Sequence, residues 1–370
     1  MDASAPVGVV GLNPETASAE DAAVLFHLEA LPVTGRNLVY AAIILLITVS
    51  LILSSIMTLA VILSTETLRD ISGCYLCSLA VSDLLCGVLI TPLSIYAALD
   101  PEWAFGTIPG SPDSGSLVCR LEAYLEIMLW SSVVYMFMWI GVDRFSALNK
   151  PTRYDVENTL TRCKCWIVFT WITSLLLSCP ILAAEMRTRY YEEAFLCVLD
   201  WGATRAYSVT LAVLVVVPSL ISVLYTFHYI FSSYIDPTEL EDTQKVLLET
   251  DNSFVLTFFV ILAFALSWLP WFALRAYETL SGQELPSQPL HFSFKWLAIG
   301  GGVWKLLIYM TMNADFREGL RLLFCCCCPR RRPRGRPVAA NYNSGKQFHN
   351  NTLQPQQYQS VALGRSIDRP

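Results

Sequence analysis

Seven long apolar runs constrain this chain more than any other feature of its sequence. They cover roughly residues 38–63, 73–98, 117–142, 163–184, 206–232, 254–274 and 290–312. A helix needs about 20 apolar residues to cross the hydrocarbon core of a bilayer, and each run has about that length. Charged residues make up only 15% of the chain, whereas a soluble domain carries roughly 25%. The sequence therefore predicts an all-α fold, a seven-transmembrane helix bundle with its termini on opposite sides of the membrane.

Basic residues indicate which side each connecting segment occupies, because lysine and arginine collect on the cytoplasmic side of a membrane. The predicted inner segments hold Arg69, Arg144, Lys150, Arg153, Arg162, Lys164, Lys245 and the run that begins at Arg330. The predicted outer segments hold Arg36, Arg120, Arg187, Arg189, Arg205 and Arg275. This excess on one side predicts an extracellular N-terminus.

Four regions follow from this topology. We predict an extracellular tail at residues 1–37, a seven-transmembrane core at residues 38–312, an interfacial helix with a cysteine run at residues 313–328, and a cytoplasmic tail at residues 329–370. The short interfacial helix is expected to be amphipathic, with apolar side chains recurring at helical spacing at Phe316, Leu320, Leu323 and Phe324. The tail is rich in Arg, Pro, Gln, Asn and Ser, which is typical of disorder.

The cysteines divide by compartment. Cys119, at the mouth of the third run, and Cys197, after the fourth, both face the oxidising side, which favours a disulfide between them. The inner run is Cys325, Cys326, Cys327 and Cys328. Adjacent cysteines beside a membrane are candidates for palmitoylation, and the arginines that follow add attraction to anionic membrane lipid. A metal site is the alternative, but no histidine or spaced second pair accompanies the run, so we expect no metal and no cofactor.

Short motifs occur in a fixed order along these runs. They are Leu79-Ala80-Val81-Ser82-Asp83, Trp103-Ala104-Phe105-Gly106, Asp143-Arg144-Phe145, Trp171 with Pro180, Pro218, Phe264 with Ser267-Trp268-Leu269-Pro270, and Tyr309 followed by Phe316. In this order and at these separations they resemble the rhodopsin-like, class A, family of G-protein-coupled receptors over about residues 38–325. The resemblance implies a signalling receptor with no enzymatic activity that acts on a heterotrimeric G protein and has no nucleic-acid partner.

The chain also departs from the family pattern. Ser54-Ser55 replaces the usual Gly-Asn of the first helix, Thr226 replaces a tyrosine of the fifth, and Lys305-Leu306 replaces Asn-Pro of the seventh. These departures cluster around the residues that the resemblance identifies as the switch, which are Asp83, Asp143, Arg144, Phe264, Lys305 and Tyr309.

Lys305 is the most unusual residue, because an ammonium deep in a membrane helix needs an anion, a water-filled cavity or a neutral state. The resemblance places Lys305 opposite Asp83, so we predict an Asp83–Lys305 pair where related receptors are thought to hold a sodium ion. The alternative is that Lys305 reaches water without pairing.

Glu126 and Lys295 give the outer pocket two opposite charges. Glu126 matches the position at which the amine-binding branch of the family has an aspartate, which favours a cationic ligand. Lys295 is expected to project into the same cavity, so the two residues could instead bridge and close the pocket. A zwitterionic ligand is the third possibility, with its ammonium on Glu126 and its acid on Lys295 or Arg275. The remaining expected ligand contacts are Trp268, Trp271, Phe272, Thr210 and Tyr96.

At the inner face, Arg144 is expected to be held by Asp143 and by either Glu249 or Asp251. The third inner loop is acidic, which fits either a solvated helix extension or an altered engagement of the G protein. Ser344, Thr352, Ser360 and Ser366 would recruit an arrestin if phosphorylated, although an unmodified linker is the default.

Three functions remain open at this point. The first is a plasma-membrane receptor that couples a small-molecule ligand near Glu126 to opening of the inner face around Arg144. The second is a divergent receptor with a self-occupied pocket, constitutively active or acting as a scaffold. The third is a seven-span transporter that uses Asp83, Lys295 and Lys305 as a path, although no inverted repeat favours it.

Overall fold

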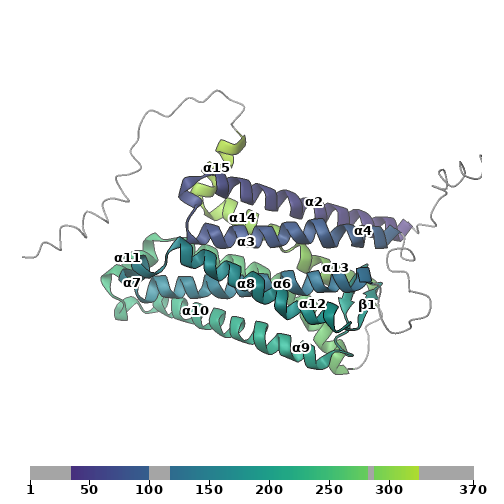
Figure 1. Ribbon diagram of the computed structural model, residues 1–370. Coiled ribbons are helices and arrows are strands. Elements are labelled where there is room, and N and C mark those ends of the chain that lie inside the picture. Colours follow the sequence, from purple (N-terminus) through teal and green to yellow (C-terminus); the bar gives the residue numbers. More distant parts are fainter. Residues whose placement is uncertain (1–34, 100–116, 282–286, 325–370) are drawn as a thin grey trace, which may run out of the picture. The chain divides into compact units, whose positions relative to one another are not determined.

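The computed structural model describes residues 35–99, 117–281 and 287–324 (Figure 1). Its helices are α2 (Gly35–Ser64), α3 (Ile71–Leu85), α4 (Thr91–Leu99), α6 (Leu117–Asn149), α7 (Pro151–Glu157), α8 (Leu160–Ala183), α9 (Arg205–Leu211), α10 (Val217–Ile235), α11 (Asp242–Thr250), α12 (Ser253–Ser281), α13 (Gln288–Gly300), α14 (Val303–Met312) and α15 (Ala314–Phe324). Single 3-10 turns occur at Glu66–Leu68 and Pro237–Glu239. Cys86–Ile90 and Ala212–Val216 form π-helical turns, which join α3 to α4 and α9 to α10.

The predicted seven-transmembrane bundle is confirmed. Among the described residues, the helices long and apolar enough to cross a membrane are Gly35–Ser64, Ile71–Leu99, Leu117–Asn149, Leu160–Ala183, Arg205–Ile235 and Ser253–Glu278. The seventh predicted span is divided between α13 and α14. The third helix continues to Asn149, beyond the predicted end at residue 142. The apolar run ends there because the next residues are charged. Their side chains form ion pairs and hydrogen bonds, so the helix continues.

Two glycines mark the break between α13 and α14. A Cβ atom built on Gly302 would lie 2.6 Å from Leu51 Cδ1 and 2.8 Å from Asp83 Cγ, and one on Gly301 would lie 2.7 Å from Ser267 Oγ. Such distances are far inside van der Waals contact. Only glycine therefore allows this part of the seventh span to approach α2, α3 and α12 so closely.

A small β-hairpin adds to the all-α fold. Strands β1 (Thr188–Tyr191) and β2 (Leu196–Leu199) pair antiparallel, with Thr188 opposite Leu199. Every residue of β2 is buried, and the expected disulfide joins its Cys197 to Cys119 at the start of α6. The hairpin packs on aromatic residues of α2, α12 and α13, including Tyr40, Trp271 and Trp296. This hairpin, called the lid below, is thus attached covalently to the third span.

The opposite end of the bundle carries short helices. α11 is a separate helix from α12, because Asp251 is extended and interrupts the chain between them, so the third loop is not a helix extension. α15 forms a helix in the stretch predicted to be amphipathic, and its Phe316 is fully buried against Val61 and Ile62 of α2. The expected features at Trp103 to Gly106, at Cys325 to Cys328 and in the tail lie outside the described residues.

Candidate functional site

Glu126 and Lys295 meet in the half of the bundle that carries the β-hairpin. This half is called outer, and the opposite half inner, after the predicted orientation. The Lys295 ammonium forms an ion pair with Glu126 Oε1, and the lysine side chain is fully buried. Lys295 Nζ also lies 4.8 Å from the centre of the Trp271 ring and 5.7 Å from that of Trp268. A buried ammonium needs both an anion and cation–π faces to offset its lost hydration. The two opposite charges therefore neutralise one another inside an aromatic box.

The cavity beside this pair is small. It holds about 70 Å³ and is lined by Glu126, Trp130, Phe264 and Trp268 among others. A ligand pocket usually measures roughly 300–1,000 Å³, so this space suits a few ordered waters rather than a ligand. The same cavity is lined by Asp83 and Lys305, so it touches both ion pairs of the bundle.

Asp83 and Lys305 form the second pair, one level deeper. Lys305 Nζ on α14 lies 2.5 Å from Asp83 Oδ2 on α3. Gly302 gives the carboxylate its space, because any side chain there would collide with Asp83 Cγ. Both side chains are largely buried, at 10% and 15% exposure, so each is the counter-ion that the other requires.

Arg144 lies at the inner end of α6 among polar partners. It donates to Asp143 Oδ2 at 2.6 Å, to Ser72 Oγ at 2.9 Å and to Ser253 Oγ at 2.5 Å. Asp251 Oδ2 lies 3.9 Å from Arg144 Nη1, and it also accepts a hydrogen bond from Ser253 at 2.7 Å. The arginine therefore ties α6 to α3 and to the start of α12.

Tyr154 supports this arrangement from α7. Burial raises the pKa of Tyr154, so its hydroxyl stays protonated and donates to Asp143 Oδ1 at 2.9 Å. Asn158 donates to the same oxygen at 3.4 Å. Asp143 thus holds Arg144 with one oxygen while its other oxygen is occupied from the second inner loop.

A family model described as 7 transmembrane receptor (rhodopsin family) matches residues 54–300, which is more than half of the chain. The chain belongs to this receptor family. The histamine H2 receptor of Homo sapiens is 25% identical over 297 residues, covering 78% of this chain and 79% of that receptor. Tachykinin-like peptides receptor 99D of Drosophila melanogaster is 22% identical over 289 residues, covering 72% of this chain and 53% of that receptor.

The receptor is therefore a multi-pass membrane protein of the G-protein-coupled class, as its motifs predicted. Its family is one of receptors and not of enzymes. Both relatives align over more than two thirds of this chain.

Three of the expected ligand contacts of the receptor lie beside the Lys295 ammonium or the Glu126 carboxylate. They are Trp268, Trp271 and Phe272, all of which line the space around the outer ion pair. Phe264 and Trp268 continue this aromatic column inward, with ring centres 6.1 Å apart. Tyr309 lies at the inner end of α14, 5.7 Å from the Phe316 ring.

Thr210 was wrongly expected in the pocket. It is exposed, and its hydroxyl donates to Ala206 O of its own helix at 2.9 Å. Thr210 lies on the exposed face of α9, and a single sequence does not show which face of this helix points into the bundle. Tyr96 is 39% exposed and is not among the residues that line the outer cavities.

Arg275 and Asp251 refine two further expectations. Arg275 donates to Glu278 at 2.8 Å, and its guanidinium carbon lies 5.8 Å from the centre of the Trp271 ring. It lines a groove with Trp201, Arg205 and Phe272. Of the two carboxylates considered for Arg144, Asp251 is the one within ion-pair distance. Glu249, the other alternative, lies exposed on the separate helix α11.

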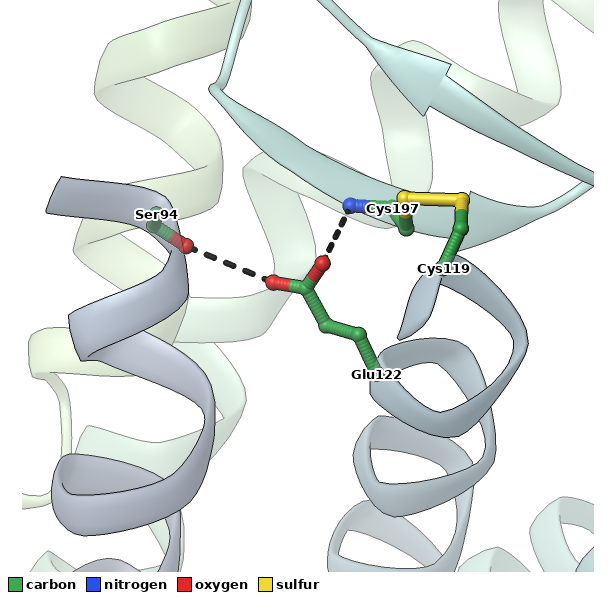
Figure 2. The surroundings of a disulfide bond; sticks show 4 residues. All are labelled: Ser94, Cys119, Glu122 and Cys197. Atoms are coloured by element: carbon green, nitrogen blue, oxygen red, sulfur yellow. Dashed lines mark hydrogen bonds between the residues drawn. A yellow bond between two sulfur atoms is a disulfide. The ribbon is translucent and has the colours of Figure 1, made fainter. Parts of the chain in front are cut away.

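Glu122 is a site residue that the sequence reasoning missed (Figure 2). It is completely buried one turn outward of Glu126, and its Oε2 accepts the Cys197 backbone N–H at 3.0 Å. Ser94 Oγ of α4 donates to Oε1 at 3.5 Å. The carboxylate thus holds strand β2 against α4 and α6 beside the disulfide. A second carboxylate four residues from Glu126 in an apolar helix was the available signal.

The inner cavity of the receptor measures about 510 Å³ and is acidic, with Asp70, Asp251 and Asp315 in its lining. Burial raises the pKa of Asp70, while the Gly73 backbone hydrogen bond and the charge of Arg144 oppose that rise. This cavity opens between α3, α12, α14 and α15.

Proposed function

We propose that this receptor is activated by a small cationic or zwitterionic ligand that separates Lys295 from Glu126, and that it signals through Arg144 to a heterotrimeric G protein. We further propose that it acts in the plasma membrane with its N-terminus outside. The observation that carries the proposal is the buried Glu126–Lys295 pair, which places two opposite charges where a ligand would enter. The acidic inner cavity favours a basic contact surface on the intracellular partner.

A zwitterion fits the pair better than a simple cation does. A cation that binds Glu126 would leave the Lys295 ammonium buried without its anion, which is costly. A ligand with both an ammonium and an acid replaces both partners at once. The relatives named for histamine and for tachykinin-like peptides support a small-molecule or peptide ligand.

A second function is supported by the size of the cavity. With about 70 Å³ available, the cavity beside Glu126 has no room for a ligand while the pair is closed. In this alternative the Lys295 ammonium serves as the receptor's own occupant of the Glu126 site, and basal signalling replaces ligand control. The two functions share the same residues and differ in what happens when the pair is broken.

Ligand-free signalling across the main G-protein classes separates them. The variants are Glu126→Gln, Lys295→Gln, the double variant and Arg144→Ala, each normalised to surface density, with exposed Glu192→Gln as the control. For a ligand-controlled receptor we expect a silent wild type, a change in basal signalling in both single variants and a response of the wild type to amine or zwitterionic compounds. For a self-occupied receptor we expect a high wild-type signal that Arg144→Ala abolishes and the pocket variants alter.

One result would overturn both functions. If all five variants and the wild type give the same signal, clearly above that of cells without the receptor, at equal surface density, neither the pair nor Arg144 takes part in coupling. Loss of signal only in Arg144→Ala would keep the coupling role and remove the pair from the mechanism.

A further inference from the structure

We propose that the receptor has a second binding site, a groove between α9 and α12 that takes a single-chain anionic lipid from the outer half of the membrane. The groove measures about 600 Å³, which is within the range of ligand sites. It is lined by Trp201, Arg205, Ser208, Val209, Trp271, Phe272, Arg275 and Ala276. Figure 1 places α9, α12 and β1 near the same end of the bundle.

The positive charge of the groove favours a ligand with an acidic group. Among the described residues, its lining contains Arg205 and Arg275 and no carboxylate. Arg275 donates to Glu278, whereas no carboxylate among the described residues lies in ion-pair contact with Arg205. A guanidinium binds carboxylate or phosphate through paired hydrogen bonds, so an acidic head group would satisfy Arg205.

The remaining surface of the groove is largely apolar and favours a ligand with a hydrocarbon chain. Trp201, Val209, Phe272 and Ala276 provide its walls, and Val209 is 61% exposed on the outer surface of the span Arg205–Ile235. Exposed valine on a membrane-spanning helix faces lipid. An amphiphile with a charged head and one hydrocarbon chain therefore matches the groove, and the membrane is its source.

The groove is separate from the charged pocket but shares a wall with it. Trp201, Trp271 and Phe272 line both the groove and the space around Glu126 and Lys295. The Trp271 ring has Lys295 Nζ at 4.8 Å and the Arg275 guanidinium carbon at 5.8 Å. A lipid in the groove would therefore press on the ring that stacks with Lys295.

Photo-crosslinking of full-length receptor in neutral-lipid nanodiscs tests this site. The probe is an oleate that carries a diazirine in its chain, and its methyl ester is the uncharged control. We expect label on peptides that contain residues 201–209 and 271–276, with labelling by the ester about tenfold weaker, the loss typical of one charge-assisted hydrogen bond. Inorganic phosphate in excess is expected to leave the labelling unchanged.

Variants make the assignment specific. Arg205→Gln is expected to lower labelling about tenfold, and Ala276→Trp is expected to abolish it by filling the groove. The matched controls are Arg36→Gln, an exposed arginine on α2, and Ala273→Trp, an exposed alanine of α12 that is outside the lining. Equal labelling of acid and ester, label spread over α2, α8 and α10, or unchanged labelling in both groove variants would each overturn the proposal. Because binding is measured directly, the result is independent of the ligand proposed for Glu126.

Discussion

Lys305 and Asp83 form an ion pair in which either residue, left without the other, would lower the stability of the fold. Removing one partner of a buried pair leaves an uncompensated charge and costs about 3–5 kcal/mol. We expect Lys305→Ala and Asp83→Ala each to lower the melting temperature of the purified receptor strongly. The double variant Asp83→Asn with Lys305→Asn is expected to be less damaged than either single asparagine variant, since no bare charge remains.

A double-mutant cycle provides the check on this pair. The four melting temperatures of wild type, Asp83→Asn, Lys305→Asn and the double variant give the interaction directly. Strictly additive effects would show that the two side chains are energetically independent despite their 2.5 Å contact.

Glu122 is predicted to hold the lid in place. Glu122→Ala leaves the buried Cys197 N–H without its acceptor, which costs about 1–3 kcal/mol. Glu122→Gln keeps an acceptor oxygen, so we expect a smaller loss. The measurement is thermal stability of the purified receptor, with exposed Glu192→Ala as the control. A melting temperature of Glu122→Ala equal to that of the wild type would remove the carboxylate from this role.

The residue pairs show what the sequence reveals at this scale. Glu126 and Lys295 were paired as one alternative because charge in an apolar helix must find a counter-charge. Glu122 escaped notice because its partners, the Ser94 hydroxyl and the Cys197 backbone, are polar groups from distant segments. Thr210 was misplaced because the sequence alone does not show which face of α9 is exposed.

The seventh span is an element whose shape depends on two glycines. Gly302→Ala would force a methyl group against Leu51 and Asp83, and overpacking of this kind costs about 1–3 kcal/mol. We expect Gly302→Ala to lower surface expression and thermal stability. Gly300→Ala is the matched control, because its added carbon would meet only Ile47 Cγ2 at 3.4 Å. Equal behaviour of the two variants would contradict the close approach.

At the scale of elements, long apolar runs predicted all seven spans, because hydrophobic length is a strong signal. The hairpin was not predicted, since its strands have only four residues each and are held by the disulfide and by aromatic contacts from elsewhere. The break between α13 and α14 is visible in the sequence as Gly300-Gly301-Gly302. Its position becomes meaningful only once the neighbours of Gly302 are known.

Orientation is a property of the whole molecule, and it is predicted with an extracellular N-terminus. An epitope tag at the N-terminus is expected to bind antibody on intact cells, and a tag after Pro370 only after permeabilisation. The physical reason is the excess of lysine and arginine in the predicted inner segments. Staining of the C-terminal tag on intact cells would reverse the topology and move Glu126 to the inner half.

Palmitoylation is predicted next to α15. Metabolic labelling with a palmitate analogue is expected to mark the receptor, and replacing Cys325, Cys326, Cys327 and Cys328 with serine is expected to remove the label. The exposed cysteines Cys165 and Cys179 serve as the matched serine controls. Label that survives the four tail substitutions would place the acyl group elsewhere.

The contact between Gly302 and Asp83 has an evolutionary consequence. Any lineage that acquires a side chain at position 302 loses the space for the Asp83 carboxylate, and Lys305 then loses its anion. Positions 83, 302 and 305 are therefore expected to be inherited as a unit. In a relative with asparagine or another neutral residue at position 305, that residue needs no anion at position 83. The residue at position 302 can then vary, provided that its side chain does not collide with residue 83.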